Sequence, residues 1–297
     1  MLDRLKSLAA FAMVLREGSF RRAAGRLDLS PSTVSYHVSE LEAFLGAPLL
    51  NRTTRRLSPT ALGSAVGVHA AAILAASEDA IALASRSTGV LRGTLSVTCT
   101  SAVIGAGFGE AVAAFSGAHP GVDIRMDVSD TLEDLGGGRF DMALRAGRMA
   151  DSALRSRKIG RIRRRLVCAP AYLAAHAPFA DAEALAGLDW IRLAGMPAWR
   201  TLAGPDGVMR DVPTPGHIVV GSIDAMIELA VAGMGLATPP AHLVEDRLAA
   251  GSLVDPVPGW TIPPIDLQAV WPDLRTGSPV RRAFVDFLVD NWSGQLA

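Results

Sequence analysis

The pattern of hydrophobic and polar positions between residues 18 and 46 predicts two helices joined by a tight turn. Ser19 can cap the first helix, whose apolar face consists of Phe20, Ala23, Ala24 and Leu27. Ser30 can cap the second helix, which has Pro31 at its first position and ends at Gly46. The apolar stripe of this second helix consists of Val34, Val38, Leu41 and Leu45. Because alanines let two short helices approach closely at a steep angle, the segment predicts a helix-turn-helix.

The face of the second helix opposite the valines carries short, uncharged groups that can form hydrogen bonds. A surface of this kind suits a helix that lies in the major groove of DNA. The candidate DNA-contacting residues of this helix and its cap are Ser30, Pro31, Ser32, Thr33, Ser35, Tyr36 and Ser39. The alternative is an ordinary helical hairpin inside a larger helical domain.

Residues 49–60 favour DNA binding over that alternative. Their sequence, LLNRTTRRLSPT, predicts two strands joined by a turn that has arginines at its tip. A cationic hairpin beside a recognition helix contacts phosphates or the minor groove. We therefore expect a winged helix-turn-helix whose wing binds DNA through Arg52, Arg55 and Arg56.

An alanine-rich stretch without proline follows at residues 60–87 and predicts one long helix. Spacings of four and three residues alternate along a seam that consists of Leu62, Val66, His69, Ile73, Ala76, Ala80 and Leu83. This heptad pattern is typical of a coiled coil, and its small seam residues would let two helices pack closely. His69 interrupts the apolar row, either as a polar residue that faces a partner or at a position edged by solvent.

Strand and helix patterns alternate through the rest of the chain, which is typical of a parallel sheet with crossover helices. Strands are expected at residues 94–99, 122–128, 140–145, 164–168, 190–191, 217–220, 236–237 and 267–271. Helices are expected at residues 101–116, 132–136, 222–232 and 279–292. This α/β pattern fits one domain or two lobes.

The N-terminal sixty residues resemble the DNA-binding domain of LysR-type transcriptional regulators. The matching motif positions are Ala23, Ala24, Leu27, Leu29, Ser30, Val34, Ser35, Leu41, Glu42, the Leu-Gly-x-Pro-Leu-Leu-x-Arg run at residues 45–52, and Gly63 after Ser58 or Thr60. Two positions depart from the family pattern, which often has Gln in place of Pro31 and Arg in place of Tyr36. Both positions face DNA in the family, so its base contacts cannot be transferred and the operator sequence stays open.

The resemblance implies a domain organisation for the whole chain. It places a winged helix-turn-helix domain at residues 1–59 and a dimerising linker helix at residues 60–89. An α/β effector-binding domain with two lobes of the periplasmic-binding-protein type then occupies residues 90–297. The first lobe would comprise about 90–161 and 264–297, and the second about 162–263.

Effector contacts are expected where the strands of the two lobes end. Ligands of open α/β sheets bind beyond the carboxyl ends of strands, where helix N-termini offer free N–H groups. The candidates are Thr100, Ser101, Ser129, Arg148, Ser222 and Thr238, together with Gly195 and Met196 on a loop that lines the cleft in relatives. Hydroxyls beside helix N-termini suit a small carboxylate or another small anion. Ser101 and Ser222 could instead be only helix caps.

The distribution of charge fits DNA binding by one end of the chain. The 297 residues carry 29 Lys and Arg and 29 Asp and Glu, so the net charge is zero. Residues 1–58 hold nine basic and five acidic side chains (+4), and the remaining 239 residues hold 20 and 24 (−4). Because the N-terminal excess is small, we expect useful affinity to require a dimer with two DNA-binding domains.

The sequence contains no apolar run of the roughly 18 residues that a membrane span needs. Its N-terminus also lacks the apolar stretch and cleavage site of a signal peptide. We therefore expect a cytoplasmic protein.

Few residues suggest covalent or metal chemistry. Cys99 and Cys168 are the two cysteines and the six histidines are scattered, so we expect no disulfide, metal site or cofactor. Each cysteine ends an apolar run, which favours a buried structural thiol over a redox switch. A nucleophile elbow, a phosphate-binding loop, a zinc-protease motif and a dinucleotide fingerprint are all missing from the sequence, so we expect no enzyme.

These features together predict a DNA-binding transcriptional regulator that a small molecule controls from the inter-lobe cleft. We expect it to bind double-stranded DNA at paired half-sites as a homodimer joined through the linker helix. The resemblance leaves a homotetramer and contact with RNA polymerase open. The alternative is a constitutive DNA-binding regulator or architectural protein whose α/β part only forms oligomers.

Overall fold

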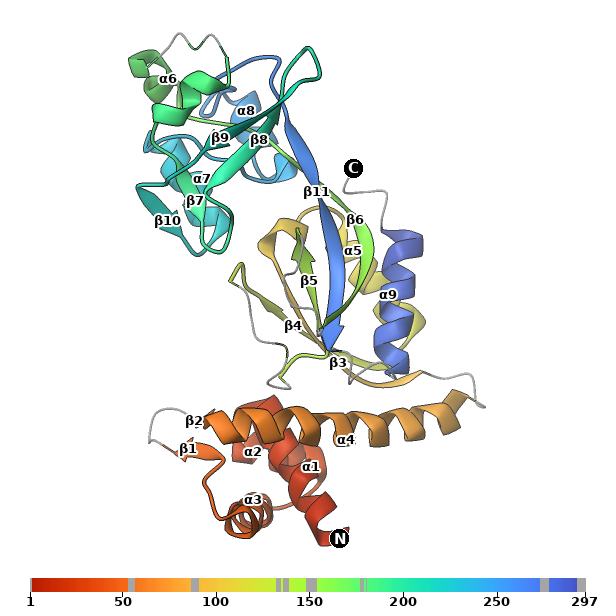
Figure 1. The fold of residues 1–297 in the computed structure, drawn as a ribbon. Coiled ribbons are helices and arrows are strands. Elements are labelled where there is room, and N and C mark those ends of the chain that lie inside the picture. The colour runs from red at the N-terminus through yellow and green to blue at the C-terminus, as the bar shows by residue number, and fades with distance from the viewer. Residues whose placement is uncertain are drawn as a thin grey trace.

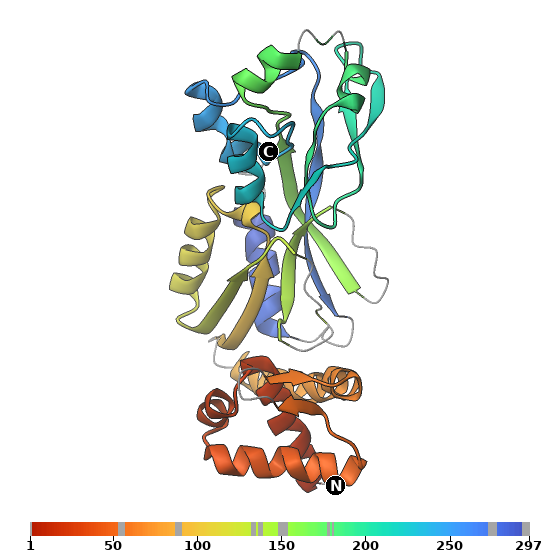
Figure 2. The same ribbon diagram turned by 90° about the vertical axis from the view of Figure 1, so that its left-hand side faces the viewer.

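A computed structural model describes residues 2–52, 57–86, 91–131, 135, 139–147, 154–176, 179, 181–272 and 278–292. The N-terminal residues form a helical headpiece, a long helix runs beside it, and a two-lobed α/β region lies beyond (Figures 1 and 2). The predicted fold class is therefore confirmed. None of the helices within the described ranges is long and apolar enough to cross a membrane.

The headpiece consists of three helices and a two-stranded wing. Its elements are α1 (Leu2–Glu17), α2 (Phe20–Leu27), α3 (Pro31–Leu45), β1 (Leu50–Arg52) and β2 (Leu57–Pro59). Ser19 and Ser30 cap α2 and α3 by accepting backbone hydrogen bonds, as the sequence predicts. Val34, Val38 and Leu41 are buried against α1 and α2, but Leu45 is 40% exposed. The expected apolar stripe is therefore one residue too long, because Leu45 is the last residue of α3 and the buried stripe stops one turn earlier.

The long helix α4 (Ala61–Arg86) packs closely on the headpiece through small residues. A side chain at Gly63 would place its Cβ 1.9 Å from the Leu49 carbonyl oxygen, and one at Gly67 would meet Leu15 at 2.6 Å. Ala70 and Ala71 are buried on the same side of the helix. The seam residues Leu62, His69, Ile73 and Ala76 are exposed in the single chain, whereas the seam residue Val66 packs against the headpiece core.

Lobe I is built on a five-stranded sheet with the order β4-β3-β5-β11-β6. The strands are β3 (Arg92–Cys99), β4 (Gly121–Val128), β5 (Met142–Ala146), β6 (Leu154–Arg164) and β11 (Ile262–Pro272). The first three are parallel, and β11 is antiparallel to both β5 and β6. Helices α5 (Phe108–Ala118) and α9 (Pro279–Asn291) contribute to its core. The antiparallel pair β6 and β11 runs from lobe I to lobe II (Figures 1 and 2).

The helix predicted at residues 101–116 begins later in the structure, because two glycines interrupt its first part. A short 3-10 helix, η1 (Ser101–Val103), comes first, and α5 begins only at Phe108. Gly105 and Gly107 have φ values of +79° and +74°, which a continuous right-handed helix does not allow. The predicted helix at 132–136 falls largely outside the described residues.

Lobe II lies between the end of β6 and the start of β11. Its strands are β7 (Ile191–Leu193), β8 (Trp199–Ala203), β9 (Met209–Pro213) and β10 (Ile218–Val220). Its helices are α6 (Pro170–His176), η2 (Glu183–Gly187), α7 (Ile223–Val231), η3 (Ala241–Leu243) and α8 (Glu245–Ala249). Strands β7 and β10 are parallel, and a parallel bridge from Trp190 to Leu236 places residues 236–237 beside β7. The strand predicted at 164–168 is wrong, because β6 ends at Arg164 and only isolated bridges follow at Val167 and Cys168.

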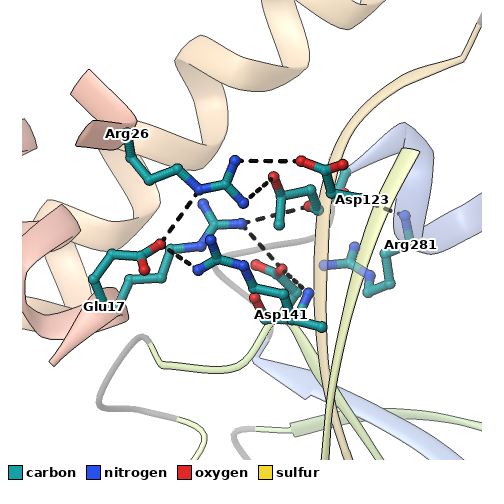
Figure 3. A network of polar contacts seen from close by, with 10 residues as sticks. Glu17, Arg26, Asp123, Asp141 and Arg281 are labelled. Atoms are coloured by element: carbon teal, nitrogen blue, oxygen red, sulfur yellow. Dashed lines mark hydrogen bonds and ion pairs between the residues drawn. The ribbon is translucent and has the colours of Figure 1, made fainter. Parts of the chain in front are cut away.

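An ion-pair cluster joins the headpiece to lobe I (Figure 3). Glu17, the last residue of α1, has a side chain that is only 4% exposed. Its carboxylate pairs with Arg26 of α2 at 3.6 Å and with Arg125 of β4. Arg26 also pairs with Asp123 of β4 at 3.2 Å. One buried carboxylate is thus shared by an arginine of the headpiece and an arginine of lobe I.

A second contact of the same interface involves Arg16 of α1. Its guanidinium lies 3.4 Å from the Asp141 carboxylate and donates to the Thr94 carbonyl oxygen of β3 at 3.4 Å. Asp141 is fixed in turn, because it accepts a 2.8 Å hydrogen bond from the Ser96 backbone N–H. The headpiece is therefore held near the N-terminal ends of β3, β4 and β5 by groups that lobe I itself positions.

Candidate DNA-binding surface and inter-lobe effector site

Helix α3 presents the polar surface that the sequence predicts. Ser30, Pro31, Ser32 and Ser39 are exposed, and Tyr36 is 61% exposed. Thr33 and Ser35 are half-buried, with Val34 and Val38 fully buried behind them. The inward valines thus hold a row of hydroxyl groups outward at the helix surface.

The hydroxyls at the start of α3 are linked to one another. The Ser30 Oγ lies 2.7 Å from both the Ser32 Oγ and the Thr33 Oγ1, and it also accepts the Thr33 backbone N–H. These bonds fix the side chains at a helix N-terminus, where backbone N–H groups favour a phosphate. This end of the helix is arranged to accept an anion.

The wing is formed by the antiparallel strands β1 and β2, in which Leu50 pairs with Pro59 and Arg52 pairs with Leu57. Glu42 of α3 ties its base to the recognition helix by accepting the backbone N–H groups of Leu49 and Leu50 at 2.9 and 3.2 Å. Arg55, Arg56 and the side chain of Arg52 lie outside the described residues. Their contact with DNA stays a prediction.

The candidate effector residues of lobe I are organised around Asp130. Its Oδ1 accepts the Thr100 hydroxyl at 2.7 Å and the Ser101 backbone N–H at 2.8 Å. Its Oδ2 accepts the Ser101 hydroxyl at 2.8 Å and, from lobe II, the Ile223 backbone N–H at 2.9 Å. The structure therefore brings the predicted residues Thr100 and Ser101 next to the start of α7 through one carboxylate.

The lobe II candidates lie at the carboxyl ends of its parallel strands. Ser222 follows β10 and caps α7 by accepting the Ala225 N–H at 3.4 Å. Ala194, next to Gly195 and Met196, donates its N–H to the Val220 carbonyl oxygen at 2.7 Å. Thr238 is buried after residues 236–237. These positions all follow the carboxyl ends of neighbouring strands of lobe II.

Ser129 is held at the same edge of lobe I by Arg145. The Arg145 guanidinium donates to the Ser129 carbonyl oxygen and to the Thr98 hydroxyl, the latter at 3.0 Å. The Ser129 hydroxyl lies 2.8 Å from the Thr131 hydroxyl. Arg148, the remaining candidate, lies outside the described residues.

Two arginines near Thr238, the buried Arg200 and the half-buried Arg164, have no carboxylate partner in the described chain. Arg200 donates to the Thr238 hydroxyl at 3.1 Å and to the Pro197 carbonyl oxygen at 2.7 Å. Arg164 donates to the Pro263 carbonyl oxygen at 3.0 Å. Burial and the charge of Arg200 lower the pKa of Arg164 to about 10, and burial also lowers the pKa of Arg200. Two cationic side chains therefore lie close together at this end of lobe II.

The effector contacts expected from the sequence include neither Asp130 nor Arg200. Asp130 could be noticed only as an acidic residue after a strand, a common arrangement. Arg200 lies two residues before Leu202 in β8, so both side chains are on the same face of the strand, and both are buried. This spacing is the sequence signal that could have identified Arg200 as an inward-facing residue. Within the described ranges no group of three or more His, Cys, Asp and Glu residues could hold a metal ion.

Comparison with known proteins agrees with this architecture. Residues 5–64 match the family model of the bacterial regulatory helix-turn-helix protein, lysR family, and residues 88–293 match that of the LysR substrate binding domain. The chain is 32% identical over 286 residues to the HTH-type transcriptional regulator PtxR of Pseudomonas aeruginosa, with 96% of this chain and 91% of that protein covered. It is 31% identical to the HTH-type transcriptional regulator CrgA of Neisseria meningitidis, with 98% of both covered.

Solved structures show the same fold over the whole chain. The structure of CrgA from Neisseria meningitidis, a LysR-type transcriptional regulator, aligns with a TM-score of 0.55 at 30% identity and covers 97% of this chain and 98% of that one. The full-length structure of the Vibrio cholerae virulence activator AphB aligns with a TM-score of 0.57 at 23% identity, covering 97% and 99%.

The chain therefore belongs to the LysR family of transcriptional regulators, and the resemblance noted in its first sixty residues is confirmed. It is a DNA-binding regulator with a domain that binds a modulating effector.

Proposed function

We propose that this regulator binds two operator half-sites through α3 and the wing of paired headpieces. The observation that carries the proposal is the outward row of Ser32, Ser35, Tyr36 and Ser39 over buried valines. Side chains of this size and polarity fit between major-groove base edges. The wing arginines Arg52, Arg55 and Arg56 would bind the adjacent phosphates or minor groove.

Pairing of the headpieces would occur through α4. The exposed seam residues Leu62, Ile73 and Ala76 give this helix an apolar surface that the single chain does not cover. Apolar seams at heptad spacing are buried when two such helices pack together. A homodimer built this way offers two recognition helices to a DNA site with matching symmetry.

We assign effector contact to the edge where the two lobes meet. The proposed contacts are Thr100, Ser101, Ser129, Arg148, Gly195, Met196, Ser222 and Thr238. A small molecule there could change the relation between the lobes, and it would act as an effector only if it binds one arrangement better than the other.

The wing assignment is tested with full-length Arg52→Ala and Arg55→Ala proteins. Retention of a DNA duplex should weaken for each variant, and the slope of affinity against salt concentration should fall by about one per lost phosphate contact. If both variants keep the parent affinity and salt slope, the wing does not contact DNA.

A constitutive regulator is the second candidate, because a carboxylate of the chain itself already bridges the lobes. Calorimetric titration with a panel of small carboxylates, alcohols and aromatic compounds separates the two. Binding of one compound that also changes operator affinity supports the effector-controlled regulator. Silence across a broad panel supports the constitutive one.

We assign the protein no catalytic role, since its named relatives are transcriptional regulators. We place its action in the cytoplasm, where a bacterial regulator meets chromosomal DNA. The described acidic residues Asp141 and Glu228 pair with arginines instead of forming a reactive set.

A further inference from the structure

The Asp130 carboxylate is fully hydrogen-bonded by donors from both lobes. Each of its oxygens accepts two hydrogen bonds, from Thr100 and Ser101 in lobe I and from the Ile223 N–H in lobe II. All four donor–acceptor distances lie between 2.7 and 2.9 Å. A carboxylate with four short hydrogen bonds has no acceptor capacity left for another group.

These four donors are the groups that would otherwise hold an anionic ligand. Two are hydroxyls, and two are backbone N–H groups at the starts of η1 and α7. The N–H of Ile223 is the first of the nine-residue helix α7, where the helix end favours negative charge. Asp130 therefore occupies the position in which a free carboxylate would find the most donors.

We propose that Asp130 is a built-in anion that ties lobe I to lobe II, so that the natural effector presents no carboxylate to these donors. The inference rests on the proposed effector site. A free carboxylate would have to displace one that is attached to the chain, and attachment gives the internal group a high effective concentration. The site should therefore bind effectors that leave the Asp130 carboxylate in place more readily than effectors that must displace it.

Removing the carboxylate should convert the site into a receptor for small anions. In Asp130→Ala, the N–H groups of Ser101 and Ile223 and two hydroxyls lose their acceptor while the surrounding backbone is retained. Formate has the same two oxygens as the missing group and is small enough to replace it. The His242 Nε2, 3.1 Å from the Ile104 carbonyl oxygen, still connects the lobes in this variant.

The experiment measures thermal unfolding of the full-length protein in increasing sodium formate, with sodium chloride replaced to keep ionic strength constant. Asp130→Ala should unfold on the order of 5 °C below the parent in chloride, because several buried donors lose their partner. Formate should restore most of this loss in a saturable manner. The matched control is Asp127→Ala, three residues before Asp130 in the chain. It removes a partly exposed carboxylate that pairs with Arg139, and it should not respond to formate.

A parent protein stabilised by formate as strongly as Asp130→Ala would overturn the proposal, because its donors would then be free. Asp130→Ala that ignores formate would overturn it as well.

Should Asp130→Ala fail to fold, hydrogen exchange on Asp130→Asn decides instead. The amide has one acceptor oxygen, so the Ile223 N–H should exchange at least ten times faster than in the parent. Unchanged exchange would contradict the tie. Operator binding by the same proteins is measured in parallel. If the parent does not bind DNA, the proposed function as a regulator is wrong. If the parent binds DNA but Asp130→Ala does not respond to formate, only the role of Asp130 is wrong.

Discussion

The two cysteine side chains are shielded from solvent and from ionisation. Cys99 ends β3 and Cys168 lies at a bridge to Val254, and both are buried. Burial raises the pKa of each thiol to about 11. For Cys99 the carboxylates of Asp130 and Asp127 add to the effect, and Arg145 opposes it. Since the thiolate is the reactive form, both side chains should be inert in the folded protein.

We therefore predict that neither cysteine of the folded protein reacts measurably with iodoacetamide at pH 8. With a pKa near 11 only about one thiol in a thousand is ionised at that pH, against roughly a quarter for an ordinary cysteine. Mass spectrometry after timed alkylation measures the result, and both thiols should react once guanidinium unfolds the chain. Rapid labelling of the folded protein would show an accessible, ionisable thiol and would reopen the redox alternative.

Single residues with local roles could be predicted from the sequence, whereas those with distant partners could not. Ser19, Ser30 and Gly46 act on backbone groups within a few positions, so their capping roles follow from spacing alone. Asp130 takes its role from Ile223, 93 residues further along the chain. Nothing near Asp130 in the sequence indicates that partner.

Helix α4 depends on two glycines that let it lie against the headpiece. The closest approach is at Gly63, where an added Cβ would lie 1.9 Å from the Leu49 carbonyl oxygen. Thr60 begins the same helix, accepting the Gly63 N–H at 2.9 Å and donating to the Pro48 carbonyl oxygen at 2.9 Å. The start of the helix is thereby fixed to the segment that leads into the wing.

Gly63→Ala should separate α4 from the headpiece and destabilise the protein by about 1–3 kcal/mol, the usual cost of inserting a methyl group into a packed contact. Gly25→Ala is the matched control, because an added Cβ in α2 meets nothing within 4 Å. That control should be neutral or more stable by about 0.5–1 kcal/mol, since alanine favours a helix. Urea unfolding of both variants measures the difference, and equal stability of the two would refute the close contact.

Element positions were predictable where amphipathic periodicity was long and uninterrupted. Helices α3, α4 and α7 start within a residue of expectation, and Ser30 and Ser222 cap α3 and α7. The helix expected at 101–116 is broken because Gly105 and Gly107 adopt positive φ values, which sequence spacing does not reveal. The long strand β6 was missed upstream of Arg164, since its exposed Arg and Lys residues conceal the pattern of a strand.

The headpiece and lobe I are connected by charge as well as by the chain. Glu17 is buried between Arg26 and Arg125, which are about a third exposed. Removal of one partner from a buried ion pair leaves a charge without compensation. The orientation of the recognition helix is therefore coupled to lobe I at this interface (Figure 3).

A double-mutant cycle with Glu17→Gln and Arg125→Gln should give a coupling free energy of about 1–3 kcal/mol in urea unfolding. The exposed pair of Asp3 and Lys6, whose atoms lie 4.0 Å apart within α1, serves as the control. Its cycle should give no more than about 0.5 kcal/mol. An equal coupling free energy in the two cycles would mean that the Glu17–Arg125 pair does not hold the headpiece on lobe I.

The relation between headpiece and lobe I could not be predicted from sequence. The contacting pairs Arg16–Asp141 and Glu17–Arg125 are separated by more than a hundred residues, and each member could equally well be a solvated surface charge. Domain identity was predictable because the helix-turn-helix and the α/β alternation are local patterns that repeat over many residues.

The most direct test of the account is the discrimination between operator and random duplex by Tyr36→Ala and Phe44→Ala. Both aromatic side chains lie on α3, and they are 61% and 56% exposed, but only Tyr36 belongs to the polar face that we assign to DNA. With the operator defined by footprinting, Tyr36→Ala should lower the affinity ratio about tenfold, as for the loss of one base contact, while Phe44→Ala should leave it unchanged. An unchanged ratio for Tyr36→Ala, or an equal loss for Phe44→Ala, would contradict the assignment of this face as the surface that reads DNA.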